Sequence, residues 1–312
     1  MLKLKNFVLL LLLFVSIPSF ADWKLSPSQY KSIESDLFAF ESVRYCPYVG
    51  LNGVMTIGIG KAIGYKKTVT TKSGRTYTKA VLWPRSKINS LFKKAGVHQM
   101  IKSQYQQIAN LNKKTNAILS NPNFDYKRDN KKYYKKQPRS NVYCLSKTDN
   151  NVELLKLLKY SIDFHANEMA KNAKARDIDL SMLPDEVIEF IFDLFYRGGP
   201  GLVLGPDTKV INKAIKEQDI LSIFKEGFAR SNAQKNKQND IRNAYYTALG
   251  MKLLSTGDKL RFKTFLKSNK AAQLASERIN DVVEKSPQSI PPHAEQPVIE
   301  LALKRNVFIN VN

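Results

Sequence analysis

The chain has 312 residues, with 50 Lys and Arg against 27 Asp and Glu, which gives a formal net charge of +23. Because 43% of its residues are hydrophobic, it can bury a core, and the composition excludes a disordered basic tail. The length suits one large or two small domains, and the positive charge favours a polyanionic partner, with solubility alone as the alternative.

The N-terminus has the pattern of a secretory signal peptide. Lys3 and Lys5 form its basic region. An apolar run from Val8 to Val15 follows, and the segment from Ser19 to Ala21 supplies small residues for cleavage before residue 22. The run is shorter than the ~20 residues that cross a bilayer, so we expect a signal peptide over 1–21 rather than an uncleaved anchor. This predicts an exported protein, either periplasmic or secreted, without a stable membrane span.

A first helix is predicted over residues 24–41. Ser26 is a suitable N-cap, Pro27 fits the first helical position and Gln29 completes a capping box. Apolar residues recur at helical spacing. They are Tyr30, Ile33, Leu37 and Phe40. The helix would therefore end in the carboxylate of Glu41.

The next segment, residues 45–61, has the pattern of a short β-hairpin. Leu51 to Gly53 is a turn sequence, and the β-formers from Met55 to Ile57 lie beside glycines that allow close backbone approach. A helix that ends in Glu41 and continues into this hairpin would form one wall of a cleft.

The stretch from Glu41 to Gly60 resembles the active-site signature of phage-type lysozymes, the endolysins that cut the glycan strands of peptidoglycan. The residues that match in register are Glu41, Arg44, Tyr48, Gly53, Thr56, Ile57, Gly58 and Gly60. Gly50 departs from the pattern, because the family has an aspartate there. The resemblance implies hydrolysis of the bond between N-acetylmuramic acid and N-acetylglucosamine, by direct attack of water with inversion.

The resemblance also implies roles for individual residues. Glu41 would be the acid that protonates the leaving oxygen, and Thr56 would hold the attacking water. For Glu41 the alternative is an ordinary surface glutamate that pairs with Arg44 at i+3. The glycines would let the glycan approach the backbone, and two other matched residues would brace the turn. The two glycines are Gly58 and Gly60, and the residues that would brace the turn are Arg44 and Tyr48.

Gly50 leaves the water-activating carboxylate missing, and three explanations remain open. A weak lysozyme would rely on Glu41 and Thr56, with Asn52 orienting water but unable to take its proton; losing a general base typically costs on the order of 10²–10⁴ in rate. In the second explanation, a carboxylate from elsewhere in the chain reaches the site. The candidates are Asp193, Asp125 and Asp129. In the third explanation the site has lost catalysis and binds glycan.

Residues 62–149 are predicted to be a basic insertion within a lysozyme-like domain of residues 22–250. The predicted elements are strands over 66–71 and 76–81 and a helix over 86–111. The run 126–143 interleaves Lys and Arg with tyrosines, and would grip the wall or an anionic envelope polymer, or else form a solvated loop.

Two cysteines, Cys46 and Cys144, fit one disulfide bond in an exported protein. The bond would join the predicted hairpin to the end of the basic run, and so pin the insertion beside the cleft. The alternative is two unpaired thiols.

Helical periodicity resumes at residue 151 and continues to residue 249. The predicted helices start at Asn151 and at Pro184, the latter stopped by Gly198 to Pro200, and then cover 208–216, 219–230 and 238–249, the last ended by Gly250. This series also resembles the helical lobe of phage-type lysozymes. The residues 251–312 lie outside the resemblance and are expected to form a C-terminal extension with a helix over 260–283.

The fold expected from these observations is α+β and lysozyme-like, with a small β-hairpin lobe, a larger helical lobe, a basic insertion and a C-terminal extension. The three histidines show no zinc-ligand spacing, so no metal or cofactor is implied. Peptidoglycan is the expected partner, anionic envelope polymers are a second, and no nucleic acid is expected. Two other functions stay open: a catalytically weakened glycan-binding protein on the same fold, and a basic binder of anionic polymers. Wall remodelling and an antimicrobial role both fit the enzyme.

Overall fold

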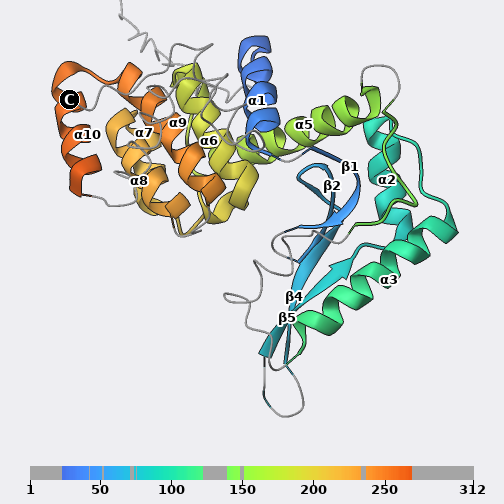
Figure 1. The fold of residues 1–312 in the computed structure, drawn as a ribbon. Helices are drawn as coiled ribbons and strands as arrows, with labels where there is room; N and C mark the ends of the chain where they lie inside the picture. The colour runs from blue at the N-terminus through green and yellow to red at the C-terminus, as the bar shows by residue number, and fades with distance from the viewer. Residues whose placement is uncertain are drawn as a thin grey trace, which may run out of the picture.

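The computed structural model describes residues 23–41, 43–50, 53–70, 74, 76–121, 139–147, 151–232 and 237–268. It contains two small antiparallel sheets and a group of helices, with α5 (Val152–Lys174) running between them (Figure 1). This confirms the α+β class. Within the described residues, no helix is long and apolar enough to cross a membrane. The predicted signal peptide, the residues 122–138 of the basic run and the tail beyond residue 268 lie outside the description.

Helix α1 (Pro27–Phe40) begins as the sequence predicts. The Ser26 hydroxyl accepts a hydrogen bond from the Gln29 N–H (3.2 Å), and the Gln29 side chain accepts one from the Ser26 N–H (2.8 Å). The helix ends at Glu41, where the backbone becomes extended and the N–H still donates to the Leu37 carbonyl. The end of α1 therefore leads directly into the first strand.

The first sheet has three strands in the order β1 (Val43–Val49), β2 (Met55–Ile59) and β3 (Lys61–Ala62). The antiparallel pair β1–β2 is the predicted hairpin, whereas β3 was not predicted separately. Gly60 adopts a φ of 73° between β2 and β3, which is a conformation that favours glycine.

The second sheet is a two-stranded ribbon of β4 (Gly64–Thr70) and β5 (Thr76–Leu82), which confirms the predicted strands. Helix α3 (Lys102–Leu119) lies along β5. The Asn116 side chain accepts a hydrogen bond from the Ala80 N–H (2.8 Å) and donates one to the Ala80 carbonyl (2.7 Å). An amide side chain thus satisfies the backbone at this edge of the ribbon, where an open strand would invite pairing with another chain.

The single helix predicted over 86–111 is wrong, because two helices occupy this region. Helix α2 (Arg85–Ala95) stops at Gly96, which has a φ of 69°, and the Val97 N–H bonds back to the Phe92 carbonyl. This left-handed glycine cap ends α2 and lets the chain reverse before α3 begins.

The helical lobe consists of α1 together with five later helices. They are α6 (Asp185–Gly198), α7 (Lys209–Lys216), α8 (Ile220–Asn232), α9 (Lys237–Leu253) and α10 (Thr256–Ser268), with short 3-10 turns at Leu180–Met182 and Gly199–Gly201. The helices predicted from Pro184 to residue 249 are confirmed. The helix predicted over 260–283 begins earlier, at Thr256, and its part beyond residue 268 lies outside the described residues. The predicted stop of α9 at Gly250 is wrong: a Cβ there would lie 2.9 Å from the Phe224 ring, so this glycine lets α8 and α9 pack closely.

Candidate functional site

Glu41 lies where α1, the first sheet and the helical lobe meet. Its Oε1 accepts a hydrogen bond from Nη2 of Arg242 on α9 at 2.5 Å. The Arg242 guanidinium also lies 5.1 Å from the centre of the Phe40 ring. The Glu41 side chain is 22% exposed whereas the Arg242 side chain is 3% exposed, so a buried cation holds a carboxylate that still reaches solvent.

Behind Glu41, the charged groups form a buried network. Asp193 on α6 lies 2.6 Å from Nη2 of Arg197 and 3.9 Å from Nη1 of Arg242, and its side chain is 3% exposed. Burial alone would lower the pKa of Arg242, but the charges of Glu41 and Asp193 raise it above its usual value. The guanidinium therefore stays charged, and the network is balanced by carboxylates on two sides.

The prediction that Asp193 reaches the substrate or activates water is wrong. Its carboxylate is enclosed between two arginines and is nearly without solvent contact, so it orients Arg242 instead. The other carboxylates considered for that role, Asp125 and Asp129, lie outside the described residues.

The second oxygen of Glu41 faces Gly60 and Tyr196. A Cβ built on Gly60 would lie 3.6 Å from Glu41 Oε2 and 3.4 Å from the Tyr196 hydroxyl. That hydroxyl donates a hydrogen bond to the Ile59 carbonyl (2.6 Å). Both distances are ordinary van der Waals contacts, so glycine is favoured here by its φ of 73° and not by a clash with the carboxylate.

Two tyrosines border the carboxylate. Burial and then the nearby charge of Glu41 raise the pKa of Tyr48, and the same two causes raise the pKa of Tyr196. Both phenols therefore keep their protons at any physiological pH and act as hydrogen-bond donors. Arg44 lies four residues before Tyr48 in β1, and its charge acts in the opposite direction, lowering the pKa of Tyr48.

Thr56 lies in β2 directly across from Tyr48, and it is 7% exposed. Its hydroxyl donates a hydrogen bond to the Val54 carbonyl (3.0 Å). Because the Thr56 hydroxyl hydrogen is used in this bond, the lone pairs of its oxygen remain to accept a hydrogen bond from water or a sugar hydroxyl. Gly50 starts the adjoining turn, with its N–H bonded to the Val54 carbonyl (2.8 Å), while Asn52 lies outside the described residues.

Gly58 does not fit its predicted role in glycan approach. It pairs with Arg44 across the sheet, has a φ of 67°, and a Cβ on it would lie 3.0 Å from a Leu157 methyl group on α5. This glycine therefore lets β2 pack closely on α5.

Beyond Tyr196 lies a second group of polar side chains on α5 and β3. His165 lies 4.7 Å from the Tyr196 ring, and burial together with the charge of Lys61 lowers the pKa of His165 to about 4. Burial likewise lowers the pKa of Lys61 to about 8, and its amine lies 4.7 Å from the centre of the Phe164 ring. His165 is therefore neutral at physiological pH, as expected of a packed histidine.

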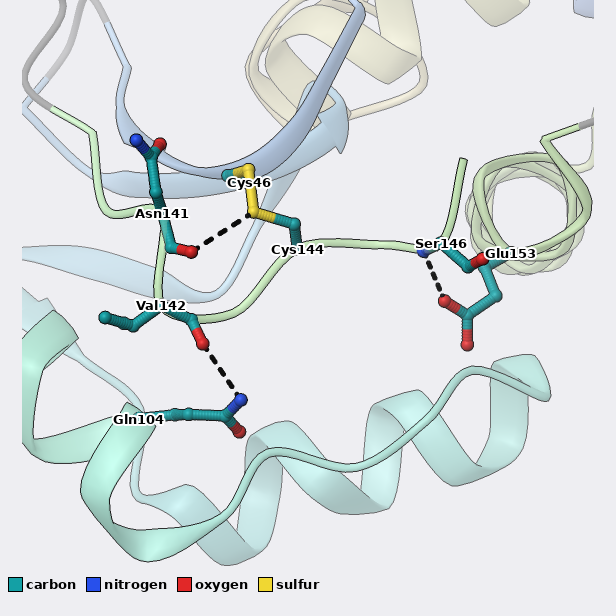
Figure 2. Close-up of a disulfide and its surroundings, with 7 residues drawn as sticks. All are labelled: Cys46, Gln104, Asn141, Val142, Cys144, Ser146 and Glu153. Carbon is teal, nitrogen blue, oxygen red and sulfur yellow. Dashed lines mark hydrogen bonds between the residues drawn. A yellow bond between two sulfur atoms is a disulfide. The ribbon is translucent and has the colours of Figure 1, made fainter. Parts of the chain in front are cut away.

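A disulfide bond ties the end of the basic insertion to the strand that follows Glu41. Cys46 of β1 and Cys144 are bonded, with their Cα atoms 4.1 Å apart, which confirms the predicted pairing. Figure 2 shows the chain around Cys144 held on both sides: the Gln104 side chain donates to the Val142 carbonyl (2.9 Å), and the Ser146 N–H donates to Glu153 (2.6 Å).

The segment 139–145 also lies against the outer side of β1. The Leu145 N–H donates to the Tyr45 carbonyl (2.8 Å) and the Ser140 N–H donates to the Pro47 carbonyl (2.9 Å). The disulfide thus reinforces backbone pairing and keeps β1 in place beside Glu41.

Comparisons of the chain with known protein families, curated proteins and solved structures found no match. Sequence reasoning missed Arg242 and Tyr196 as site residues, although both lie in segments that it compared with the helical lobe of lysozymes. Over the described ranges, no group of three or more His, Cys, Asp or Glu side chains is placed to hold a metal ion.

Proposed function

We propose that the protein is a peptidoglycan hydrolase that cleaves the glycan strand between N-acetylmuramic acid and N-acetylglucosamine. The observation that supports this best is the Glu41 carboxylate, which is 22% exposed and fixed by a buried arginine. The carboxylate lies beside Gly60, and both residues belong to the segment that resembles the phage-type lysozyme signature.

In this proposal Glu41 first takes up a proton from solvent on Oε2, and it donates this proton to the glycosidic oxygen as the bond to the sugar C1 breaks. Arg242 holds Oε1, which leaves Oε2, beside Gly60, for the substrate. Thr56 accepts a hydrogen bond from the water that attacks C1 on the opposite face of the sugar, and that water then loses its proton to bulk solvent. Because Gly50 stands where the family has its aspartate, we expect slow turnover.

A second function is supported by the surroundings of Asp193. Asp193, one of the three carboxylates considered as substitutes for the family's aspartate, is buried between Arg197 and Arg242 and has almost no contact with solvent. This favours a protein that binds the glycan strand through the same site without cutting it.

The test is incubation of the chain with purified peptidoglycan, followed by mass spectrometry of the soluble products. Wild type is compared with E41Q and T56V. The matched control is E34Q, which makes the same chemical change on the same helix, away from the site. Products with new reducing ends should come from wild type and E34Q, should be absent with E41Q and should be reduced with T56V.

The outcomes separate the two functions. Products from E41Q would show that Glu41 is not the acid. If no variant gives products while wild type sediments with the wall, hydrolysis is rejected and glycan binding is retained. Urea unfolding of each variant shows whether a loss of products reflects a loss of folding.

A further inference from the structure

The positive charge of the chain is concentrated in one part of the sequence. Residues 42–147 contain 22 Lys and Arg but only two acids, Asp125 and Asp129, so they supply +20 of the total of +23. The rest of the chain has 28 basic residues against 25 acidic ones and is close to neutral. Between positions 42 and 124 the sequence has no Asp or Glu at all. Such asymmetry within one chain indicates an anionic partner for that part.

The β4–β5 ribbon lies within this acid-free stretch, and two of its lysines face each other. Lys67 is paired directly with Lys79 across the strands. Like charges in this position destabilise a ribbon, and both side chains are exposed. A bound anion between them would remove the repulsion.

The same face of the ribbon carries aromatic side chains. Alternate residues of a strand point to the same side, which places Tyr65 and Tyr77 on the face of the two lysines. Tyr65 is 48% exposed. We define the ribbon face by its six residues. They are Tyr65, Lys67, Val69, Tyr77, Lys79 and Val81.

The other face of the ribbon is covered only at one end, at Ala80. The exposed residues on that face are Lys66, Thr68, Thr70 and Thr76. Ala80 points to that side and is only 2% exposed, with α3 packed along β5. In Figure 1 the ribbon extends away from helices α6–α10, with α3 beside it. The ribbon face thus lies on the side opposite Ala80, and it exposes Lys67, Lys79 and Tyr65 to solvent.

We propose that the ribbon face binds an anionic polysaccharide. Lys67 and Lys79 contact its carboxylates or phosphates, and Tyr65 and Tyr77 lie against the apolar faces of its sugars. A polysaccharide is favoured over nucleic acid because the Cys46–Cys144 disulfide is typical of proteins outside the cytosol. The binding does not rest on hydrolysis at Glu41, which lies at the end of α1 and outside the ribbon.

The test measures binding of the full chain to polygalacturonate, a carboxylated polysaccharide, at low ionic strength. The double variant K67Q/K79Q should bind about tenfold more weakly than wild type. The matched control K213Q/K216Q removes the same charge from exposed lysines of α7, and should stay within about twofold of wild type. Salt should weaken the binding of wild type more steeply than that of K67Q/K79Q.

A tyrosine variant separates sugar contact from charge. Y65S should weaken binding to polygalacturonate by about threefold or more, and should leave binding to inorganic polyphosphate, which has no sugar, unchanged. E41Q should bind polygalacturonate as wild type does, so that failure of the hydrolase proposal and failure of this one are distinguishable.

Four results would overturn the proposal. The first is an equal loss of affinity in K67Q/K79Q and in the α7 control. The second is equally tight binding of neutral dextran, because the lysines would then have no role. The third is tighter binding of a DNA duplex than of polygalacturonate, which would assign the ribbon face to nucleic acid. Removing the lysine repulsion should leave thermal stability unchanged or higher, so a lower midpoint for K67Q/K79Q would also count against it.

Discussion

In the helical lobe the buried charges around Glu41 lie beside charges of opposite sign, whereas in the β4–β5 ribbon lysine faces lysine. Arg242 lies between Glu41 and Asp193, and Asp193 pairs with Arg197. Lys67 and Lys79 are paired across the strands, in a stretch of sequence without acids. The first arrangement is complete within the protein and fixes one carboxylate. The second is electrostatically unfavourable by itself, which is expected of a surface that meets an anion from outside.

The largest effect should come from breaking the internal network. R242M leaves the carboxylates of Glu41 and Asp193 without their shared cation, and we expect a loss of about 3–5 kcal/mol in the free energy of unfolding. The control R261M removes an arginine that is 76% exposed and pairs with Asp258 at 3.5 Å, which should change stability by less than about 0.5 kcal/mol. Urea unfolding measures both, and equal losses would show that the buried network is no stronger than a surface pair.

The next effect concerns the disulfide bond, which stabilises the part of the molecule around the first sheet. The disulfide joins cysteines 98 positions apart, and removing it with C46S/C144S should lower stability by up to about 4 kcal/mol. The reason is that the bond restricts the unfolded chain. Denaturant unfolding with and without a thiol reductant measures the effect: wild type should respond to reductant and the variant should not. A wild type that is indifferent to reductant would contradict this prediction.

A third prediction concerns His165, which lies beside the site in a neutral form. Its pKa is lowered to about 4 in the folded protein, against about 6.5 when exposed. Between these values the unfolded chain binds more protons, so stability falls as the pH drops from 6.5 to 4, by at most about 3 kcal/mol. H165Q should remove this part of the pH dependence. Above pH 7 the two proteins should have parallel stability curves, and parallel curves at pH 4–6 would disprove the assignment.

Local signals in the sequence predicted most elements of this fold. The capping box at Ser26 and the glycine stop after α6 both act within a few residues. The errors came from glycines whose role depends on distant packing. Gly96 ends a helix, whereas Gly250 continues one because Phe224 requires the space. No property of the neighbouring residues distinguishes these two cases.

The candidate site was predictable only where its residues are close in sequence. Glu41 and Gly60 belong to one motif, and the structure brings them together. Arg242 contacts Glu41 from 201 positions away, and nothing local marks it as the partner. Asp193 was expected to meet the substrate. Its enclosure was not predicted, because one of the two arginines beside it comes from its own next helical turn and the other comes from α9. Long-range pairing of charges decides which carboxylate is exposed, and only the fold specifies it.

The smallest effect tests the comparison most directly, because one type of substitution should have opposite signs in the two regions. K67E places a carboxylate opposite Lys79 and turns repulsion into attraction, so stability should rise by about 0.2–1 kcal/mol. K213E, on α7, replaces the partner of Glu217 (3.8 Å, one helical turn away) with a like charge, so stability should fall by about 0.3–0.5 kcal/mol. Thermal unfolding at low salt measures both, and both shifts should shrink at high salt. A fall in stability with K67E would mean that the ribbon lysines already have an anionic partner within the protein, and that the ribbon face is not built for one outside it.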